Sequence, residues 1–134
     1  MKRDWDTVRL ILTKLEELPD SLSTLELFDF YFDEGVNPDD DFYDIDNRIS
    51  YHMALLIEDG LVVGSMDDHV SINARNFKVV RLTSAGHDFL DSIRQDTVWK
   101  KTKETLISKG VDMTYETIKQ VAIATVTSML GLST

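Results

Sequence analysis

The chain has 134 residues, of which 43% are hydrophobic and 28% are charged. This composition suits one folded domain with its own core and excludes a repeat array or a disordered chain. The absence of cysteine excludes disulfides, thiolate zinc sites, iron–sulfur clusters and cysteine nucleophiles. No signal-peptide pattern follows Met1, and no apolar run reaches the roughly 18 to 20 residues of a membrane span. We therefore expect a cytoplasmic protein with no membrane partner.

The net charge of −10 disfavours indiscriminate binding to nucleic acid, because lysine and arginine supply most of the non-specific affinity for DNA. The charge is unevenly distributed along the chain. Residues 1–74 carry 5 basic and 18 acidic side chains, whereas residues 75–109 carry 8 basic and 4 acidic ones. Any nucleic-acid contact is therefore expected in the middle third of the chain.

The first expected helix begins after Asp4, which can cap it, and ends before Pro19. Its apolar stripe at helical spacing consists of Trp5, Val8, Ile11, Leu12 and Leu15. In residues 22–33 the side chains at odd and even positions form two alternating sets, a pattern that permits a strand as readily as a helix. We favour a short strand or an irregular edge. Residues 35–46 contain Pro38 and three consecutive aspartates, a pattern typical of a loop or of a capped helix start.

A second helix is predicted up to Gly60, because Ile45, Ile49, Met53 and Leu56 recur at helical spacing. A strand then starts at Leu61. A β-ribbon is expected to follow, with turn residues at 66–68 and 73–76 and a return strand over 77–82.

Three further helices complete the expected fold. Thr83 caps the first, in which Ala85, Phe89, Leu90 and Ile93 share a face, and Asp96 caps the second, which Gly110 ends. The last helix, over 113–130, is apolar around much of its circumference, which is typical of a helix covered from two directions. The helix could be covered by packing within the chain, by a second copy of the chain, by another partner or by a membrane surface. A second copy would bind through Ile118, Val121, Ala122, Val126 and Met129.

Two segments carry a resemblance to a known family. Residues 48–62 (RISYHMALLIEDGLV) are similar to the recognition helix of winged-helix proteins, which ends in an acidic residue and Gly-Leu before the first wing strand. Residues 81–90 (RLTSAGHDFL) resemble the segment that leaves the second wing strand and caps the next helix. Together with residues 2–6 and 96–103, they identify the chain as a member of an uncharacterised family of small winged-helix proteins common in bacteria, phages and prophages.

This resemblance implies an α+β fold, a winged-helix-like domain with a β wing over residues 1–94 followed by a C-terminal helical extension over 95–134. It implies a phage or prophage setting but supplies no mechanism. The acidic segment from Asp29 to Asp46 departs from the compact second helix of ordinary winged-helix regulators, which puts inherited DNA binding in doubt.

A winged helix reads base edges with the side chains of its recognition helix. Here the available readers are Asn47, Arg48, Ser50 and Tyr51, with His52 as a further candidate. The preceding acidic residues disfavour this mode, because phosphates would have to approach them. A second candidate surface is the wing with the basic helix after it, which carries Arg75, Lys78, Arg81, Lys100, Lys101 and Lys103. These charges could equally be solubilising and partly paired with nearby acids.

The acidic segment suggests a different class of function. Its carboxylates and interleaved aromatic rings could imitate a phosphate backbone and bind a host protein; the residues are Asp39, Asp40, Asp41, Phe42, Tyr43, Asp44 and Asp46. The alternative is that this segment is a solvated acidic loop with no binding role.

Chemical sites are not indicated. The acidic loop fails the EF-hand pattern, since Tyr43 and Asp44 fall where that pattern needs an acid or amide and then glycine. The three histidines lie on three different expected elements, and no phosphate-cradling loop or nucleophile motif occurs. We expect a non-enzymatic protein without metal, cofactor or small-molecule substrate, which binds either DNA as a regulator or a host protein, and which can form a homodimer.

Overall fold

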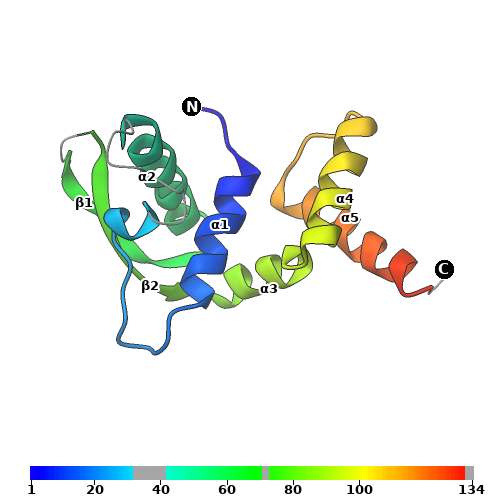
Figure 1. The fold of residues 1–134 in the computed structure, drawn as a ribbon, viewed down its shortest axis with the longest axis horizontal. Helices are drawn as coiled ribbons and strands as arrows, with labels where there is room; N and C mark the ends of the chain where they lie inside the picture. The colour runs from blue at the N-terminus through cyan, green and yellow to red at the C-terminus, as the bar shows by residue number, and fades with distance from the viewer. Residues whose placement is uncertain (32–41, 71–72, 132–134) are drawn as a thin grey trace. The chain divides into compact units, whose positions relative to one another are not determined.

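The computed structural model describes residues 1–31, 42–70 and 73–131. It shows an α+β protein with two compact units, Met1–His87 and Asp88–Thr134, which divide inside a helix. We describe each unit by itself (Figure 1). The elements are α1 (Trp5–Glu16), the 3₁₀ helix η1 (Leu27–Phe30), α2 (Phe42–Glu58), β1 (Val62–Val70), β2 (Arg75–Leu82), α3 (Ser84–Ile93), α4 (Asp96–Ser108) and α5 (Tyr115–Met129).

Helix α1 follows the sequence prediction closely. The Asp4 carboxylate accepts hydrogen bonds from the backbone N–H of Asp6 and from the hydroxyl of Thr7, so it satisfies donors that the first turn leaves free. The five predicted apolar side chains are all buried. Burial of this stripe against α2 and the ribbon makes α1 a central element of the first unit.

The segment after α1 is an irregular edge, in agreement with the favoured interpretation. Leu25 forms an isolated antiparallel bridge with Val79 of β2, through backbone hydrogen bonds of 2.9 and 3.1 Å. The chain then turns into η1, whose start is held by Asn76: its side-chain oxygen accepts from the N–H of Leu27. Leu25 and the start of η1 are therefore fastened to β2 by hydrogen bonds.

Helix α2 buries Ile49, Met53 and Leu56. It ends at Gly60, which adopts φ 78°, and the next N–H, of Leu61, bonds back to the carbonyl of Leu56. This left-handed glycine closes the helix and redirects the chain into β1. The expected loop before α2 lies mostly in residues 32–41, outside the described residues.

The ribbon differs from the prediction in the position of its turn. Residues 66–68 do not turn, because β1 continues to Val70 and Met66 pairs with Phe77. The return strand accordingly starts at Arg75 instead of Phe77. Figure 1 shows the two antiparallel strands running along α2 in this unit.

Helix α3 begins as expected, with the Thr83 hydroxyl accepting from the N–H of Gly86. Of the four residues predicted for its inward face, Phe89, Leu90 and Ile93 are buried, whereas Ala85 is exposed and Gly86 is buried beside it. A Cβ at Gly86 would lie 2.2 Å from the carbonyl oxygen of Leu61. Glycine at this position therefore allows the helix to approach the backbone that enters β1.

Helices α4 and α5 pack together in the second unit, where the ring of Tyr115 meets that of Phe89 edge-on at 5.0 Å. The predicted cap at Asp96 is wrong by one residue, because Gln95 is the N-cap and its side chain makes no capping bond. Gly110 ends α4 with φ 65°, as expected. Among the helices that the structure describes, none is long and apolar enough to cross a membrane.

Candidate nucleic-acid interface

The predicted reading face of α2 is partly turned into the protein. Ser50 is buried and its hydroxyl donates to the carbonyl oxygen of Arg75 at 2.7 Å. The guanidinium of Arg48 donates to the Thr7 hydroxyl at 2.9 Å and lies 3.8 Å from the Asp44 carboxylate. These two side chains serve to fasten α2 to the ribbon and to α1, and neither reaches outward as a base reader would.

Asn47 and Tyr51 form the outward side of α2 together with Tyr43. The three residues lie four apart, so they share one helix face. The Asn47 amide donates to the carbonyl of Tyr43 within the helix, while the rings of Tyr43 and Tyr51 are 59% and 40% exposed. This face therefore presents aromatic rings and an amide, with no lysine or arginine among the three residues.

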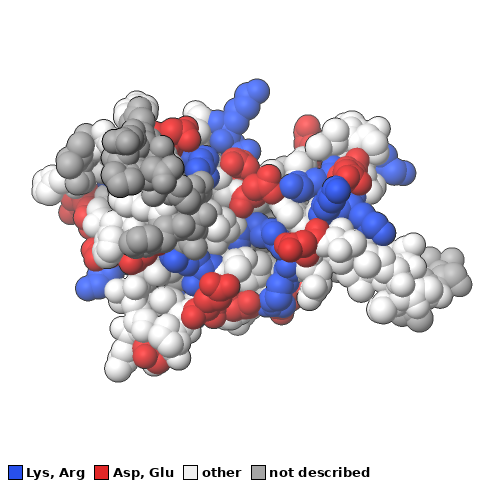
Figure 2. Space-filling view, in the orientation of Figure 1, with Lys and Arg blue, Asp and Glu red and all other residues white. Residues whose placement is uncertain are grey.

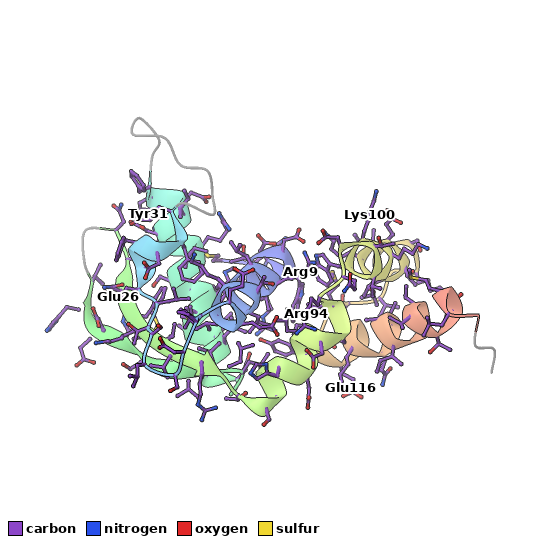
Figure 3. All side chains as sticks on the ribbon, turned by 60° about the horizontal axis from the view of Figure 1, so that its bottom comes forward. Arg9, Glu26, Tyr31, Arg94, Lys100 and Glu116 are labelled. Atoms are coloured by element: carbon purple, nitrogen blue, oxygen red, sulfur yellow. The ribbon has the colours of Figure 1, made fainter. Side chains whose placement is uncertain are left out.

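Asp46, which the sequence placed in the acidic surface, is a buried structural carboxylate. Its Oδ1 accepts from the Tyr31 hydroxyl at 2.5 Å and its Oδ2 accepts from the Asn73 amide at 3.1 Å. Tyr31 stands beside the first turns of α2 (Figure 3). Desolvation raises the pKa of the Tyr31 phenol to about 12, and the hydrogen bond to Asp46 adds to the shift.

The remaining acidic candidates divide between α2 and the undescribed segment. Phe42 packs its ring against Tyr31 at 4.6 Å and is only partly exposed. Asp44 and Tyr43 are exposed at the start of α2. Asp39, Asp40 and Asp41 lie outside the described residues. Among the described residues, the exposed acidic surface at this end of α2 reduces to Asp44 beside Tyr43.

His52 is buried in α2 and is hydrogen-bonded on both ring nitrogens. Nδ1 donates to the carbonyl of Arg48 at 2.7 Å, and Nε2 accepts from the backbone N–H of Asp4 at 2.7 Å, an assignment that fixes the neutral tautomer. Desolvation lowers the pKa of this imidazole. His52 thus joins the start of α1 to α2 and is not available to a ligand.

Two basic residues of the β1–β2 ribbon, the predicted wing, are brought to one face by an irregularity in strand pairing. Val63 pairs with Arg81 and Gly64 pairs with Val79, so Val80 is an extra residue in β2. Since consecutive residues of a strand point to opposite faces, Arg81 shares its face with Val63 rather than with buried Val79.

Lys78 lies on this same face of the ribbon, because it pairs with Ser65, two residues along β1 from Val63. Lys78 and Arg81 are both exposed. The Arg81 guanidinium donates to the carbonyl of Leu82 and remains at the surface. We call this pair of basic residues, with Val63 and Ser65 opposite them, the outer wing face.

Arg75 belongs to the tip of the wing. Its Nε donates to the carbonyl oxygen of Asp67 at 2.6 Å, across the ribbon. Asp67 and Asp68 are themselves exposed, so positive and negative charges lie close together here. The tip is therefore less basic than the outer wing face.

Helix α4 supplies a second basic surface, which lies in the other unit. Lys100 and Lys101 are exposed, and Lys100 projects from α4 away from α5 (Figure 3). Lys103 is only partly exposed and lies over the ring of Trp99, with 5.1 Å between its ammonium and the ring centroid. On the face shown in Figure 2, basic side chains gather over α4 with acidic ones between them.

The residues proposed for self-association fall into two groups. Ile118 and Ala122 have no exposed surface because they pack inside the second unit, so a second copy cannot contact them. Val121 is partly exposed, while Val126 and Met129 are 37% and 49% exposed. Ile123 and Leu130, which the sequence analysis did not include, are also exposed.

Two structural roles could not have been assigned from sequence. Asn76 fastens η1 through Leu27, and Thr7 receives Arg48 from α2; both contacts join residues more than forty positions apart, and no local pattern marks them. Metal ligation has no support within the described ranges, where no three histidine or carboxylate side chains gather closely enough to hold an ion.

The first unit thus defines a small α+β protein in which a helix is followed by a two-stranded ribbon with a basic outer face. The chain belongs to a family of hypothetical proteins, DUF2513, whose model matches residues 2–112. It is 37% identical over 132 residues to an uncharacterized protein of Haemophilus influenzae, a match that covers 98% of this chain and 100% of that relative. No solved structure matches. The prediction of membership in an uncharacterised family is confirmed.

Proposed function

We propose that this protein is a non-enzymatic, winged-helix DNA-binding module, which contacts the phosphate backbone through the outer wing face and through the lysines of α4. The order of elements supports the winged-helix interpretation: a capped helix, a short edge at Leu25, a helix closed by glycine, and a ribbon. The bridge between Leu25 and Val79 supplies the third strand position that such a wing requires.

The observation that carries the DNA proposal is the extra residue at Val80. Without it, Arg81 would share a face with the buried side chains of β2. With it, Lys78 and Arg81 present two cations on one side of a projecting ribbon, with uncharged residues opposite them. Paired cations at such spacing suit consecutive phosphates of a strand, whose contacts position a protein on a duplex.

The mode of contact follows from what α2 lacks. Major-groove reading needs long polar side chains aimed outward from the recognition helix, but Arg48 and Ser50 are engaged within the fold. Asn47 and Tyr51 remain as accessory contacts. The proposed binding is therefore dominated by contacts to the DNA phosphate backbone and has weak sequence preference. The wing makes the main contacts, and α2 makes accessory ones.

Charge reversal on the wing tests this proposal against a matched control. Lys78→Glu and Arg81→Glu should each weaken binding to a random duplex, measured by fluorescence anisotropy at low salt. Lys2→Glu makes the same charge change at an exposed residue outside both basic surfaces and should have a smaller effect. Equal effects of all three would show that only net charge matters and would remove the wing from the interface.

A second candidate function has its own observation. The exposed rings of Tyr43 and Tyr51, with Asp44 beside them, form a surface suited to a protein partner, since aromatic residues are enriched in interfaces. Such a module would act on a host protein through an acidic and aromatic face, with Asp39, Asp40 and Asp41 as neighbours in sequence. Asp44→Asn with Tyr43→Ala would abolish that interaction and leave or strengthen DNA binding, the reverse of the wing variants.

A further inference from the structure

The net charge of the protein is confined to one of its two units. Residues 1–87 carry 8 basic and 18 acidic side chains, which gives the whole −10 of the chain. Residues 88–134 carry 6 of each and are formally neutral. Two copies of this chain would therefore repel each other through their first units, and the second unit is where they can meet without that repulsion.

Within the second unit, α5 presents apolar side chains that the rest of that unit does not cover. Ile123, Val126 and Met129 are 54%, 37% and 49% exposed, although Ile118 and Ala122 earlier in the helix are fully buried. The ten residues from 121 to 130 contain no charged side chain. Figure 1 shows this end of α5 extending past α4. The apolar surface thus continues where intrachain cover stops.

Two grooves flank α5. One runs between α3 and α5, contains Ile123 and Val126, and has Asp88, Asp91 and Lys119 as its charged lining residues. Asp91 also pairs at 2.6 Å with Arg94, the first residue after α3, so Asp88 contributes most of the remaining negative charge. We call this the acidic groove, since its lining residues sum to one negative charge.

The other groove runs between α4 and α5 and contains Met129. Its charged lining residues are Lys101, Glu104 and Lys109, which sum to one positive charge, and we call it the basic groove. Residues 119, 123 and 126 of α5 face the acidic groove and residues 121, 125 and 128 face the basic groove. At about 100° per residue these sets lie roughly 200° apart around the helix, so the grooves lie on opposite sides of α5.

A surface with an acidic side, an apolar ridge and a basic side is complementary to a copy of itself. In a two-fold dimer each groove meets a groove of the other copy. An axis parallel to α5 sets the acidic groove of each copy opposite the basic groove of the other. An axis perpendicular to α5 sets like charges together. The charge distribution therefore selects the first arrangement.

We propose that the protein forms a two-fold homodimer through α5, in which the uncharged segment 121–130 of this helix, the ridge, packs against its symmetry mate and the acidic groove of each copy faces the basic groove of the other. This goes beyond the proposed DNA contact and does not depend on it. The partner is a second copy because the same face carries both signs of charge and no net charge, whereas DNA or an acidic membrane would require a basic face.

The test is sedimentation equilibrium on the full chain across a range of protein concentrations. The wild-type protein should reach a mass twice the 15.3 kDa of one chain. Ile123→Glu with Val126→Glu should raise the dissociation constant at least tenfold, because two carboxylates would replace exposed apolar side chains that the dimer buries, and their desolvation is costly. Ile107→Glu is the matched control: this apolar residue of α4 is 71% exposed and lines neither groove, so its variant should dimerise normally.

Charge reversal provides a second, independent test. A variant with Asp88→Lys and Asp91→Lys has two basic grooves, and a variant with Lys101→Glu and Lys109→Glu has two acidic grooves. Each should dimerise at least tenfold more weakly alone, and an equimolar mixture of the two should recover a dimer. Circular dichroism of each variant reports whether the fold is kept.

Several results would overturn the proposal. A wild-type protein that remains monomeric at all concentrations would exclude the dimer. A dimer that persists in the variant with Ile123→Glu and Val126→Glu would place the interface elsewhere. Normal dimerisation of both charge-reversal variants would exclude the pairing of acidic and basic grooves. Binding of the isolated monomer to vesicles of neutral lipid through Ile123 and Val126 would assign the ridge to a membrane surface instead.

Discussion

Replacement of Thr102 by valine should stabilise the protein. Thr102 is fully buried in α4, and its hydroxyl has no hydrogen-bond partner among the described residues. Valine has almost the same shape and is also β-branched, so the packing is kept while an unsatisfied hydroxyl is removed. An unsatisfied buried polar group costs about 1 to 3 kcal/mol. We expect a gain of about 1 kcal/mol, because side-chain rotation recovers part of that cost in the wild type.

Thr7→Val is the matched control for this prediction. Thr7 is as buried as Thr102, but its hydroxyl donates to the Asp4 carboxylate at 2.7 Å and accepts from Arg48 at 2.9 Å. Valine there leaves both partners without their bond, so stability should fall by about 1 to 3 kcal/mol. Thr102→Ser keeps the hydroxyl and removes a methyl group, which should also destabilise the fold.

Thermal unfolding followed by circular dichroism measures the Tm of both variants. For a chain of this length, 1 kcal/mol corresponds to a shift in Tm of roughly 3 to 5 °C. Thr102→Val should raise Tm by about that amount and Thr7→Val should lower it. A loss of stability in Thr102→Val comparable to that in Thr7→Val would show that the Thr102 hydroxyl is bonded, and the reasoning would be refuted.

Three further predictions concern other elements. Gly86→Ala should lower Tm by about 4 °C or more, because its Cβ would meet the Leu61 carbonyl at 2.2 Å and overpacking costs about 1 to 3 kcal/mol; an unchanged Tm would contradict this contact. Burial lowers the pKa of His52, so the unfolded state binds more protons and the free energy of unfolding should fall as pH drops below 6.5; His52→Gln should flatten this dependence in urea titrations, and an unchanged dependence would contradict it. Tyr31, with its pKa raised to about 12, should ionise well above pH 10 in an ultraviolet titration of wild type against Tyr31→Phe, and stability should decline as pH rises from 10 through 12.

The elements with strong local signals were predictable from sequence. Helix α1 has both a capping aspartate and a complete apolar stripe, and α2 has a stripe that ends at a glycine in the left-handed region. The cap at Thr83 likewise depends on residues close in sequence. In each case the signal and the structure it determines lie within about one turn of each other.

The misplaced turn has a physical cause. Asp67 and Asp68 favour turns in general, but here they lie in an irregular, exposed part of β1, between the residue pairs Met66–Phe77 and Val70–Arg75 that keep the strand beside β2. Strand pairing is a tertiary contact, and it overrides a local preference that costs little at an exposed position.

The candidate interface was predictable in composition but not in geometry. Lys78 and Arg81 stand out as basic residues in an acidic chain, yet a strict alternation along β2 would place them on opposite faces. Only the extra residue at Val80 brings them together. The hydrogen bonds of Arg48 and Ser50 within the fold were unpredictable for a similar reason, since their partners Thr7 and Arg75 are distant in sequence.

The measurement that tests the central claim most directly is fluorescence anisotropy of a labelled random duplex against the wild-type protein and the Lys78→Glu, Arg81→Glu double variant, from low to high salt. The account predicts that wild-type affinity falls linearly with salt on logarithmic axes, and that the slope decreases by about 2 in the double variant, since each lost phosphate contact removes roughly 0.9. Absence of binding at low salt, or an identical slope in the two proteins, would contradict it.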